Sequence, residues 1–510
     1  LFAMIGVLVL DIACENYMNQ ATPRSLKRAK EIGLRKVVGA ARGQIARQFL
    51  ADSLMTTFLA LLLAGGAVKA ILPVFRSLVE REIAFDPVRD VELAAGLVIL
   101  ALLVGILAGS YPAFFLSAFR PATSLKGTSA STSRGRGLRN GLIVFQFATS
   151  IALIVCTIGV QRQLRYIRTA DMGYEREQIV VLTPPGVLRK AVPAFKAELL
   201  RNPSVLAVSA SSYLPNNVSS STIANWPGKP DSFRVPIYRL EVDDDFVGLY
   251  GLKLARGRAF SRDFPSDSGG AFLINETAAK AIGWEDPLGR DFCRWGIDKK
   301  PAGRIVGVLR DFHMHSLHLP IMPLYVLFNP EASDRISIKI RGGDIPRTMA
   351  YLKSTWDQFM GGYPFEYVFF DDVFDRAYQA EQRLGTIFEA FAGLAVLVAC
   401  LGLVGLASFT AEQKSKEIGI RKVLGASSSG VIILLSLEFM KWVVAANLIA
   451  WPIGYFAMQS WLRSFAYRTS LTVPMFLGAA LAAFALAAVV ISLQTYRAAA
   501  ANPVESIRCE

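Results

Sequence analysis

The three histidines of this 510-residue chain all lie in one short stretch, "DFHMHSLHLP". His313, His315 and His318 are close enough to suggest a metal site, and Asp311 would add a carboxylate ligand. A metal site needs a fixed ligand geometry, however, and an ordinary structural loop accounts for the same spacing. We favour the loop, so we predict no metal site here.

The chain carries no sequence motif of an ATPase. The pattern Gly-x-x-x-x-Gly-Lys-(Ser/Thr) does not occur, and the nearest stretches, "WPGKPD" and "LKGTSA", lack the first glycine at the required distance. No Ser/His/Asp or paired-carboxylate arrangement can be argued either. We therefore predict no catalytic residue and no cofactor bound by this chain, with any ATP hydrolysis carried out by another polypeptide.

One charged stretch occurs twice, as "KEIGLRKVVGA" and as "KEIGIRKVLGA", with nine of eleven residues identical. Glu31 and Arg35, like Glu417 and Arg421, have the i, i+4 spacing and the order that favour an ion pair on a helix. Apolar residues alternate with the charges, and Gly39 then permits a turn. Each copy predicts a short amphipathic helix.

Two interpretations of this helix remain open. It could lie on lipid headgroups, or it could dock on a protein partner. Membrane binding needs basic residues and an apolar face, but it does not need the same Glu-Ile-Gly order twice. We favour a protein partner.

Two carboxylates fall inside the apolar segments that follow the repeated stretch. Asp52 and Glu438 correspond to each other at the offset of the repeat, which is 386 residues from Lys30 to Lys416. A carboxylate inside a membrane is costly unless it is paired or close to the interface. These side chains either tie the segment to the charged helix or reach back to the headgroups, and both interpretations stay open.

Six apolar segments are long enough to span a bilayer. Their approximate bounds are Phe49–Leu72, Leu93–Leu116, Leu142–Val160, Leu384–Phe409, Val431–Met458 and Val473–Leu493. The opening run "LFAMIGVLVLDIA" is shorter and lacks the features of a signal peptide, so we interpret it as a truncated transmembrane helix. Within the second segment, "GILAG" has the small-xxx-small spacing that permits close helix packing.

The basic residues lie in alternate connections between these segments. "ATPRSLKRAKEIGLRKVVGAARGQ" carries seven Lys and Arg against one Glu, and "FRPATSLKGTSASTSRGRGLRN" carries five against no acid. By the positive-inside rule these connections are cytoplasmic. The net charge of +14 therefore reflects membrane topology and does not indicate nucleic-acid binding.

The composition fits a membrane protein with a large water-soluble part. Hydrophobic residues make up 53% of the chain and charged residues 19%, and the mean hydropathy is +0.37. Residues 161–382 are polar overall and contain patterns typical of strands, such as "RISIKIRG" and "RIVGVLRDF". We predict an α+β extracytoplasmic domain with helical stalks. The five cysteines form no close-spaced pair, so no disulfide framework or zinc knuckle is predicted.

The repeat indicates a duplicated membrane unit whose first copy is incomplete, because only 29 residues precede its motif. The predicted fold class is an α-helical polytopic membrane protein with two pseudo-repeated four-span units and a large α+β extracytoplasmic domain. The predicted order is as follows: 1–20 the end of a truncated transmembrane helix, 21–45 a cytoplasmic coupling segment, 46–116 two transmembrane helices, 117–139 a cytoplasmic linker, 140–160 a transmembrane helix, 161–382 the extracytoplasmic domain, 383–410 a transmembrane helix, 411–429 a second coupling segment, 430–496 two transmembrane helices, and 497–510 a cytoplasmic tail.

The two charged stretches, together with "ACENYMNQATPRS" and "IVGVLRDFHMHSLHLPIMPLYVL", resemble the MacB/FtsX-type permeases of ABC transporters, in the duplicated form with MacB-like periplasmic domains. The resemblance covers essentially the whole chain. It implies a bacterial inner-membrane protein that couples to a separate cytoplasmic ABC ATPase dimer, which uses ATP and Mg. A periplasmic adaptor or outer-membrane component is a further implied partner.

The same resemblance implies that each repeated helix docks in a groove of the ATPase. The implied coupling residues are Lys30, Glu31, Ile32, Gly33, Arg35, Lys36 and Gly39 in the first copy, and Lys416, Glu417, Ile418, Gly419, Arg421, Lys422 and Gly425 in the second. Two functions follow as alternatives. One is a permease for efflux of an antibiotic, a peptide or lipid-linked cargo, working by mechanotransmission. The other is a transmembrane signalling device that activates a periplasmic hydrolase or a sensor kinase.

Overall fold

The structure is a computed structural model that divides into two compact units. The first consists of Leu1–Arg162, Gln382–Trp461 and Ser470–Glu510, and the second of Gln163–Glu381 and Leu462–Thr469. The structure describes residues 2–27, 34–79, 84–117, 132–230, 232, 235–268, 270–292, 303–332, 334–414, 417, 420–421, 424 and 427–500. We call the unit that contains Leu1–Arg162 the membrane unit, and the unit that contains Gln163–Glu381 the outer unit.

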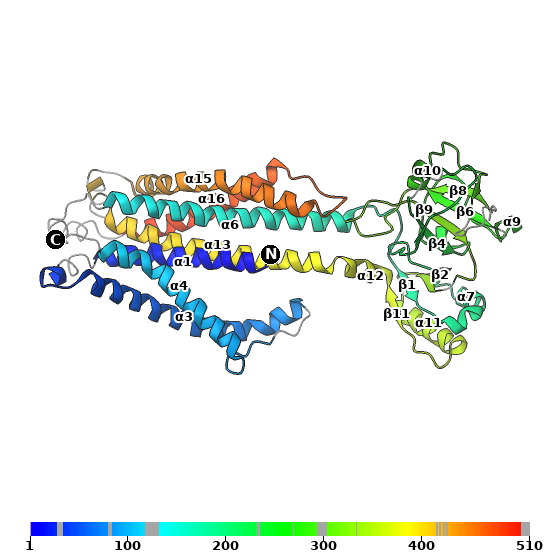
Figure 1. Ribbon diagram of the computed structural model, residues 1–510, viewed down its shortest axis with the longest axis horizontal. Helices are drawn as coiled ribbons and strands as arrows, with labels where there is room; N and C mark the ends of the chain where they lie inside the picture. Colours follow the sequence, from blue (N-terminus) through cyan, green and yellow to red (C-terminus); the bar gives the residue numbers. More distant parts are fainter. Residues whose placement is uncertain are drawn as a thin grey trace. The chain divides into compact units, whose positions relative to one another are not determined.

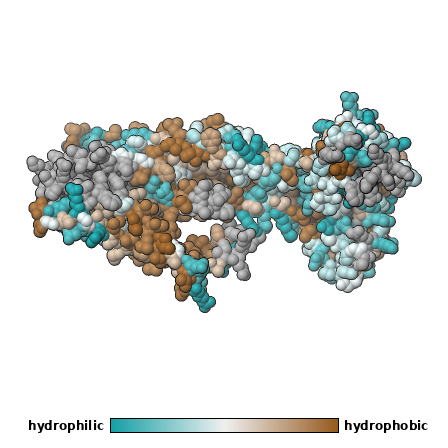
Figure 2. Space-filling view, viewed as in Figure 1, coloured by the Kyte–Doolittle hydropathy of each residue, from teal (hydrophilic) through white to brown (hydrophobic). Residues whose placement is uncertain are grey.

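Long helices build the membrane unit (Figure 1). They are α1 (Phe2–Lys27), α3 (Arg42–Val79), α4 (Val91–Ser117), α6 (Thr132–Thr169), α13 (Gln379–Gln413), α15 (Ser428–Leu462) and α16 (Val473–Ala500). Six of them, all except α1, are long and apolar enough to cross a membrane. The six predicted spanning segments are therefore confirmed as helices. Hydrophobic side chains cover much of the surface of this unit (Figure 2).

Three helix ends differ from the sequence-based expectation. Helix α1 continues to Lys27, into the segment expected to couple, and α6 already begins at Thr132, within the expected linker. The first expected stalk is helical, since α6 continues to Thr169. The second is interrupted at Tyr378, because the φ of −116° and ψ of 14° there are not helical. It is therefore two helices, α12 (Phe370–Ala377) and then α13.

Close packing in the membrane unit depends on small residues, as "GILAG" predicts. A Cβ at Gly105 would lie 2.8 Å from Leu54 Cδ2, and one at Gly109 would lie 2.7 Å from Ser53 Cβ. Helices α3 and α4 therefore approach at these two glycines. The apolar core of the second half is formed by side chains of α6, α13, α15 and α16, among them Ile151.

The outer unit contains one mixed sheet. Its strands are β1 (Ile179–Leu182), β2 (Val205–Ser211), β3 (Ser221–Thr222), β4 (Ile237–Val242), β5 (Leu254–Gly257), β6 (Ala271–Asn275), β7 (Asp291–Phe292), β8 (Gly303–Leu309), β9 (Leu324–Phe328), β10 (Arg335–Ile340) and β11 (Tyr367–Phe369). Their order is β11-β1-β10-β2-β4-β9-β6-β8-β5, with β3 beside β4 and β7 beside β8. The β4–β9 and β6–β8 pairs are parallel and the others antiparallel, so the domain is α+β as predicted.

Short helices complete this unit. They are the 3-10 helix η2 (Gly186–Ala191), α7 (Val192–Leu199), α8 (Phe246–Leu249), α9 (Pro265–Ser268), α10 (Glu276–Ile282), α11 (Ile345–Phe359) and α12. Two apolar cores lie against the sheet. One joins α7 and α11 to β1, β2 and β10, where Phe195 meets Trp356 edge-to-face at 6.0 Å between ring centroids. The other joins α10 to β4, β6, β8 and β9.

Candidate functional site

The first copy of the repeated stretch ends in a glycine-dependent turn. Residues 34–37 are helical, and Gly39 has a φ of +103°, a conformation that L side chains rarely adopt. The amide of Ala40 donates to the carbonyl of Arg35 at 2.9 Å, and that of Gly39 to Lys36 at 3.1 Å. These are the bonds of a Schellman C-cap. The next helix, α3, therefore starts in a fixed direction.

The arginine of the motif has different neighbours in the two copies. In the second, Arg421 Nη2 lies 2.7 Å from Glu417 Oε1, which is the predicted i, i+4 ion pair. Both side chains are about half exposed. In the first, Arg35 Nη1 donates to Gln48 Oε1 on α3 at 2.9 Å. Its expected partner, Glu31, lies outside the described residues.

Several other predicted coupling residues also lie outside the residues that the structure describes. They are Lys30, Ile32, Gly33, Lys416, Ile418, Gly419, Lys422 and Gly425. Lys36 is half-buried, and Gly39 is exposed.

Apolar side chains are exposed at matching positions of the two copies. Leu34 is 61% exposed and its counterpart Ile420 is 49% exposed. Val38 and its counterpart Leu424 are 82% and 80% exposed. The repeat thus preserves an apolar surface beside charged residues, which suits either a protein groove or the membrane surface.

The two predicted membrane carboxylates lie on α3 and α15. Glu438 Oε2 is 2.5 Å from Lys414 Nζ, so an ion pair joins α15 to the residue that follows α13. Asp52 is exposed on α3, and its backbone carbonyl accepts a hydrogen bond from Thr56 Oγ1 at 2.8 Å.

Polar residues that the sequence analysis overlooked join α6 to α13. Gln146 and Ser150 are buried and donate to the carbonyls of Val398 and Ala395, each at 3.5 Å. Asn16 of α1 donates to the same Val398 carbonyl at 3.4 Å. Side-chain bonds to backbone carbonyls are a common way to join membrane helices. Polar residues within the apolar runs of α6 and α1 were the available sequence signal.

The histidine-rich stretch binds a segment that is distant in sequence. We call Leu462–Thr469, which connects α15 to α16, the clasp segment. The amide of Tyr467 donates to the carbonyl of Leu317 at 3.1 Å, and the amide of Ala466 donates to that of His318 at 3.3 Å. Tyr467 Oη in turn accepts from the amide of Ile321 at 3.3 Å. Backbone and side chain thus hold the clasp segment within the outer unit.

A buried glutamine completes this attachment. Gln163 is fully buried, donates from Nε2 to the carbonyl of Tyr467 at 3.1 Å, and accepts from the amide of Thr469 at 2.9 Å. Both functions of its amide are therefore satisfied by the clasp segment. Nothing in the local sequence pattern signals such a pairing across 304 residues.

The three histidines have three different aromatic partners. His313 meets Tyr467 edge-to-face at 4.5 Å, and His318 stacks on Phe465 at 4.0 Å. His315 instead meets Tyr238 of β4 at 4.9 Å. The pKa values of His313 and His315 are lowered because burial disfavours the charged imidazolium. This arrangement gives the stretch a packing role.

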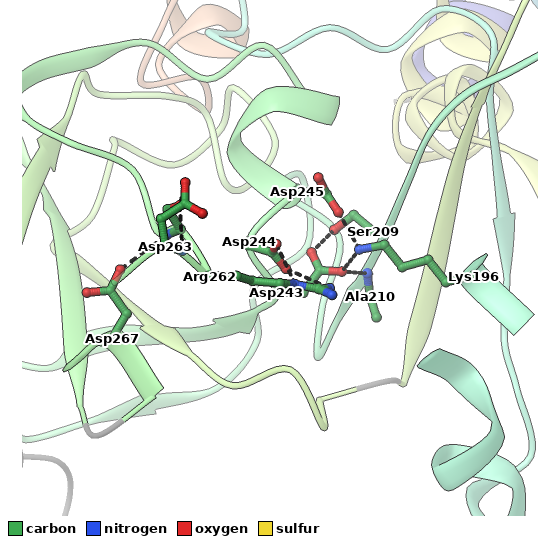
Figure 3. Close-up of polar contacts among 10 residues, drawn as sticks. Lys196, Ser209, Ala210, Asp243, Asp244, Asp245, Arg262, Asp263 and Asp267 are labelled. Carbon is green, nitrogen blue, oxygen red and sulfur yellow. Dashed lines mark hydrogen bonds and ion pairs between the residues drawn. The ribbon is translucent and has the colours of Figure 1, made fainter. Parts of the chain in front are cut away.

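Figure 3 shows three consecutive aspartates at the end of β4. Oxygen atoms of Asp243, Asp244 and Asp245 lie within 4.8 Å of one another, a spacing that could hold a metal ion. Two cations already occupy the cluster. Lys196 Nζ lies 2.6 Å from Asp243 Oδ2 and 2.5 Å from Asp245 Oδ2, and Arg262 Nε lies 2.8 Å from Asp244 Oδ2. Each carboxylate therefore has an ion-pair partner from the chain.

The buried member of this cluster is also hydrogen-bonded. Asp243 accepts from Ser209 Oγ at 2.7 Å and from the amide of Ala210 at 2.9 Å, both on β2. Burial alone would lower the pKa of Lys196, but the carboxylates of Asp243 and Asp245 raise it. The cluster is a structural ion-pair network that joins α7, β2 and β4.

The comparisons with known proteins agree with the duplicated membrane architecture. The model of the family described as "FtsX-like permease C-terminal" matches residues 4–121 and 389–503, and each matched range contains one copy of the repeated stretch. The ABC transporter permease YknZ of Bacillus subtilis, itself uncharacterized, is 20% identical over 280 residues, which are 53% of this chain and 69% of YknZ.

Two other matches cover smaller parts of this chain. The macrolide export ATP-binding/permease protein MacB of Bdellovibrio bacteriovorus is 35% identical over 131 residues, which are 25% of this chain and 19% of that protein. The crystal structure of the periplasmic region of MacB from Actinobacillus actinomycetemcomitans has 17% identity and a TM-score of 0.29, covering 41% of this chain and 96% of that one.

Six candidate membrane spans among the described residues, a mixed-sheet domain and two matched segments are typical of a polytopic membrane permease. The chain is thus similar to FtsX-like permeases and to the ABC transporter permeases YknZ and MacB.

Proposed function

We propose that this chain is the permease subunit of an ABC transporter of the bacterial inner membrane, with its outer unit in the periplasm. A separate ATPase dimer would hydrolyse ATP with Mg, while this chain binds no nucleotide and transmits the movement. The clasp segment is the observation that carries the proposal. It lies between the spanning helices α15 and α16, yet it is part of the outer unit.

The physical argument concerns how movement reaches the outer unit. Helix α6 continues from the membrane unit into the outer unit without interruption, and α12 leads back to α13. The clasp segment adds a third connection, held by the bonds to Leu317, His318 and Gln163. A displacement of α15 and α16 would therefore pull directly on the sheet domain, as in a hinge or shear transition.

The coupling role of the repeated helix rests on its exposed surface. Leu34 and Val38 in one copy, and Ile420 and Leu424 in the other, expose apolar area beside charges. Two equivalent helices suit a dimeric ATPase, which offers two equivalent grooves. By analogy with the relatives named for macrolide export, the cargo would be an antibiotic, a peptide or a lipid-linked molecule, and a periplasmic adaptor would be a further partner.

The charge-swap variant Glu417→Arg/Arg421→Glu tests the coupling role. It keeps the net charge and the i, i+4 pair, but it presents like charges to a partner groove, where such contacts cost several kcal/mol. We expect stimulation of ATP hydrolysis in proteoliposomes with the cognate ATPase to fall at least tenfold. Membrane-surface binding alone predicts no change.

The matched control exchanges another exposed i, i+4 pair, Lys353 and Asp357 of α11. Lys353→Asp/Asp357→Lys should leave ATP hydrolysis unchanged. The double variant Phe465→Ser/Tyr467→Ser then tests the clasp segment. We expect it to bind the ATPase normally and to lose transport. Normal stimulation in the charge-swap variant would refute the coupling role, and normal transport with the clasp segment detached would refute the mechanical one.

A further inference from the structure

The membrane unit contains an apolar cavity of about 280 Å³ between α1, α6, α13 and α15. On α6 its lining includes every fourth residue, Ala148, Ala152, Cys156 and Val160. On α15 the same spacing recurs, with Ile449, Ile453, Ala457 and Trp461. Residues four apart lie on one face of a helix, so the cavity is a groove that runs along both helices. We call it the α6/α15 groove.

The length of this groove is close to the thickness of one leaflet of the hydrocarbon core. Twelve residues separate Ala148 from Val160, which is about 18 Å along a helix. One leaflet of the hydrocarbon core is about 15 Å thick. Both helices are candidate membrane spans, so the groove is parallel to the chains of the surrounding lipid.

The walls close where the helices touch. A Cβ at Gly159 would lie 2.7 Å from Met458 Cε, and one at Gly454 would lie 2.9 Å from Val155 Cγ1. The groove is thus a fixed gap beside a tight helix contact. Its edge is open, because Ile449 is 47% exposed in the absence of a bilayer.

The chemistry of the groove excludes water and favours hydrocarbon. Its lining is apolar except for Thr149 and Cys156. An apolar cavity offers water no hydrogen bonds and stays dry, but it binds apolar molecules. At this depth of a bilayer, the available apolar molecules are lipid acyl chains.

Polar residues follow the lining residues in sequence at one end of the groove. Next to the lining residues Val160 and Phe388, Gln161 Nε2 donates to Glu389 Oε1 at 2.7 Å. The adjacent Arg162 is exposed and donates to Thr472 Oγ1 at 2.7 Å, which leaves further donors of its guanidinium. A cation and a carboxylate at the end of a hydrocarbon groove complement a headgroup that carries a phosphate and an amine.

We propose that the α6/α15 groove binds one acyl chain of a phospholipid with an amine-bearing headgroup, taken from the surrounding bilayer. The chain lies between α6 and α15, the phosphate pairs with Arg162, and the amine pairs with Glu389. This lipid is a resident ligand of the permease and not its cargo. It fills a gap between α6 and α15.

Native mass spectrometry of the full-length protein in mild detergent tests the proposal, with dioleoyl phosphatidylethanolamine as the probe. We expect saturable retention of one lipid. Ala152→Phe, which fills the groove, should weaken retention at least tenfold. If Ala152→Phe lowers the melting temperature, Ala457→Phe replaces it in this test, because Ala457 is exposed and a phenylalanine there also fills the groove. The matched control is Leu448→Phe, because Leu448 is on the same helix, 72% exposed and outside the groove.

Two further variants test the proposed contacts with the lipid headgroup. Arg162→Gln should weaken both phosphatidylethanolamine and phosphatidylglycerol several-fold, whereas Glu389→Gln should weaken only phosphatidylethanolamine. Equal retention by the filled variants and by Leu448→Phe would overturn the proposal, because the retained lipid would then be surface lipid. Release of the lipid on addition of the ATPase with ATP would also overturn it, since a cargo leaves and a resident lipid stays. Neither result bears on the ATPase coupling proposed above.

Discussion

Lys196 is a buried cation, and its contribution to the stability of the outer unit depends on its neighbours. Its side chain is 9% exposed and that of Asp243 is 4% exposed, so removing either partner leaves a charge in a poorly hydrated place. The lysine therefore stabilises the fold only as part of a satisfied network with Asp245, Ser209 and Ala210.

Lys196→Met should destabilise the outer unit by about 3–5 kcal/mol, because Asp243 would remain buried without its cation. Unfolding in denaturant can be followed through the fluorescence of Trp356, which packs against the neighbouring Phe195. The double variant Lys196→Met/Asp243→Asn is the control and should be less destabilised than Lys196→Met. If the double variant were the less stable of the two, the ion-pair explanation would be wrong.

The buried histidines predict a pH dependence of stability. The pKa values of His313 and His315 are lowered by burial in the folded protein, so the unfolded chain binds more protons as pH falls through the ordinary value of about 6.5. The stability that this contributes is present at neutral pH and is lost as pH falls below that value. Unfolding of the full-length protein measured from pH 7.5 to 5 should show this loss. His313→Gln/His315→Gln should show a flatter profile, and an unchanged slope would contradict the assignment.

At the scale of secondary-structure elements, connections between helices are set by single residues. Gly39 ends the first repeated helix in a left-handed conformation, whereas Gly43, four residues later, is inside α3 with open space around it. The hydroxyl of Ser427 has a comparable role at α15, where it accepts from the amide of Gly430 at 3.1 Å as an N-cap.

Gly39→Ala should weaken the turn by about 1–2 kcal/mol, because a Cβ disfavours its φ of +103°. Hydrogen exchange across residues 34–40 should then accelerate roughly fivefold or more. The same substitution at Gly43 is a matched control. Gly43 is the second residue of α3 and does not need a left-handed φ, so alanine is tolerated and exchange there should slow or stay the same. Equal acceleration by both variants would argue against the Schellman turn.

At the scale of the whole molecule, the predicted topology places the two ends of the spanning helices in different compartments. Ser427 precedes α15, next to the second repeated helix, and Ser266 is on α9 of the outer unit. The basic connections are expected in the cytoplasm. The clasp segment and the sheet domain share one unit, so we predict that both lie in the same compartment, the periplasm.

Reporter fusions test this topology. A fusion ending at Ser427 should be active only with a cytoplasmic reporter, and one ending at Ser266 only with a periplasmic reporter. A fusion within the clasp segment, at Ser464, should behave like that at Ser266. Cytoplasmic reporter activity at Ser464 would contradict the predicted topology of α15 and α16. It would also contradict the proposed mechanical connection through the clasp segment.

Local composition predicted the spanning helices and some strands of the sheet. Transfer of a segment into a bilayer depends on its own length, apolarity and flanking charges, so six helices could be predicted from runs such as Val473–Leu493. Alternating apolar residues likewise predicted β10 in "RISIKIRG" and β8 in "RIVGVLRDF". The duplication was visible because sequence identity itself records it.

Tertiary structure alone decided which distant residues meet. Gln163 and Tyr467 are 304 residues apart, and Lys196 and Asp243 are 47 apart, so no periodicity within one element could pair them. The α6/α15 groove likewise exists because two apolar helix faces contact at Gly159 and Gly454 and leave a cavity beside that contact. A sequence states that a face is apolar, but only packing decides whether that face meets another helix, a lipid or the outer unit.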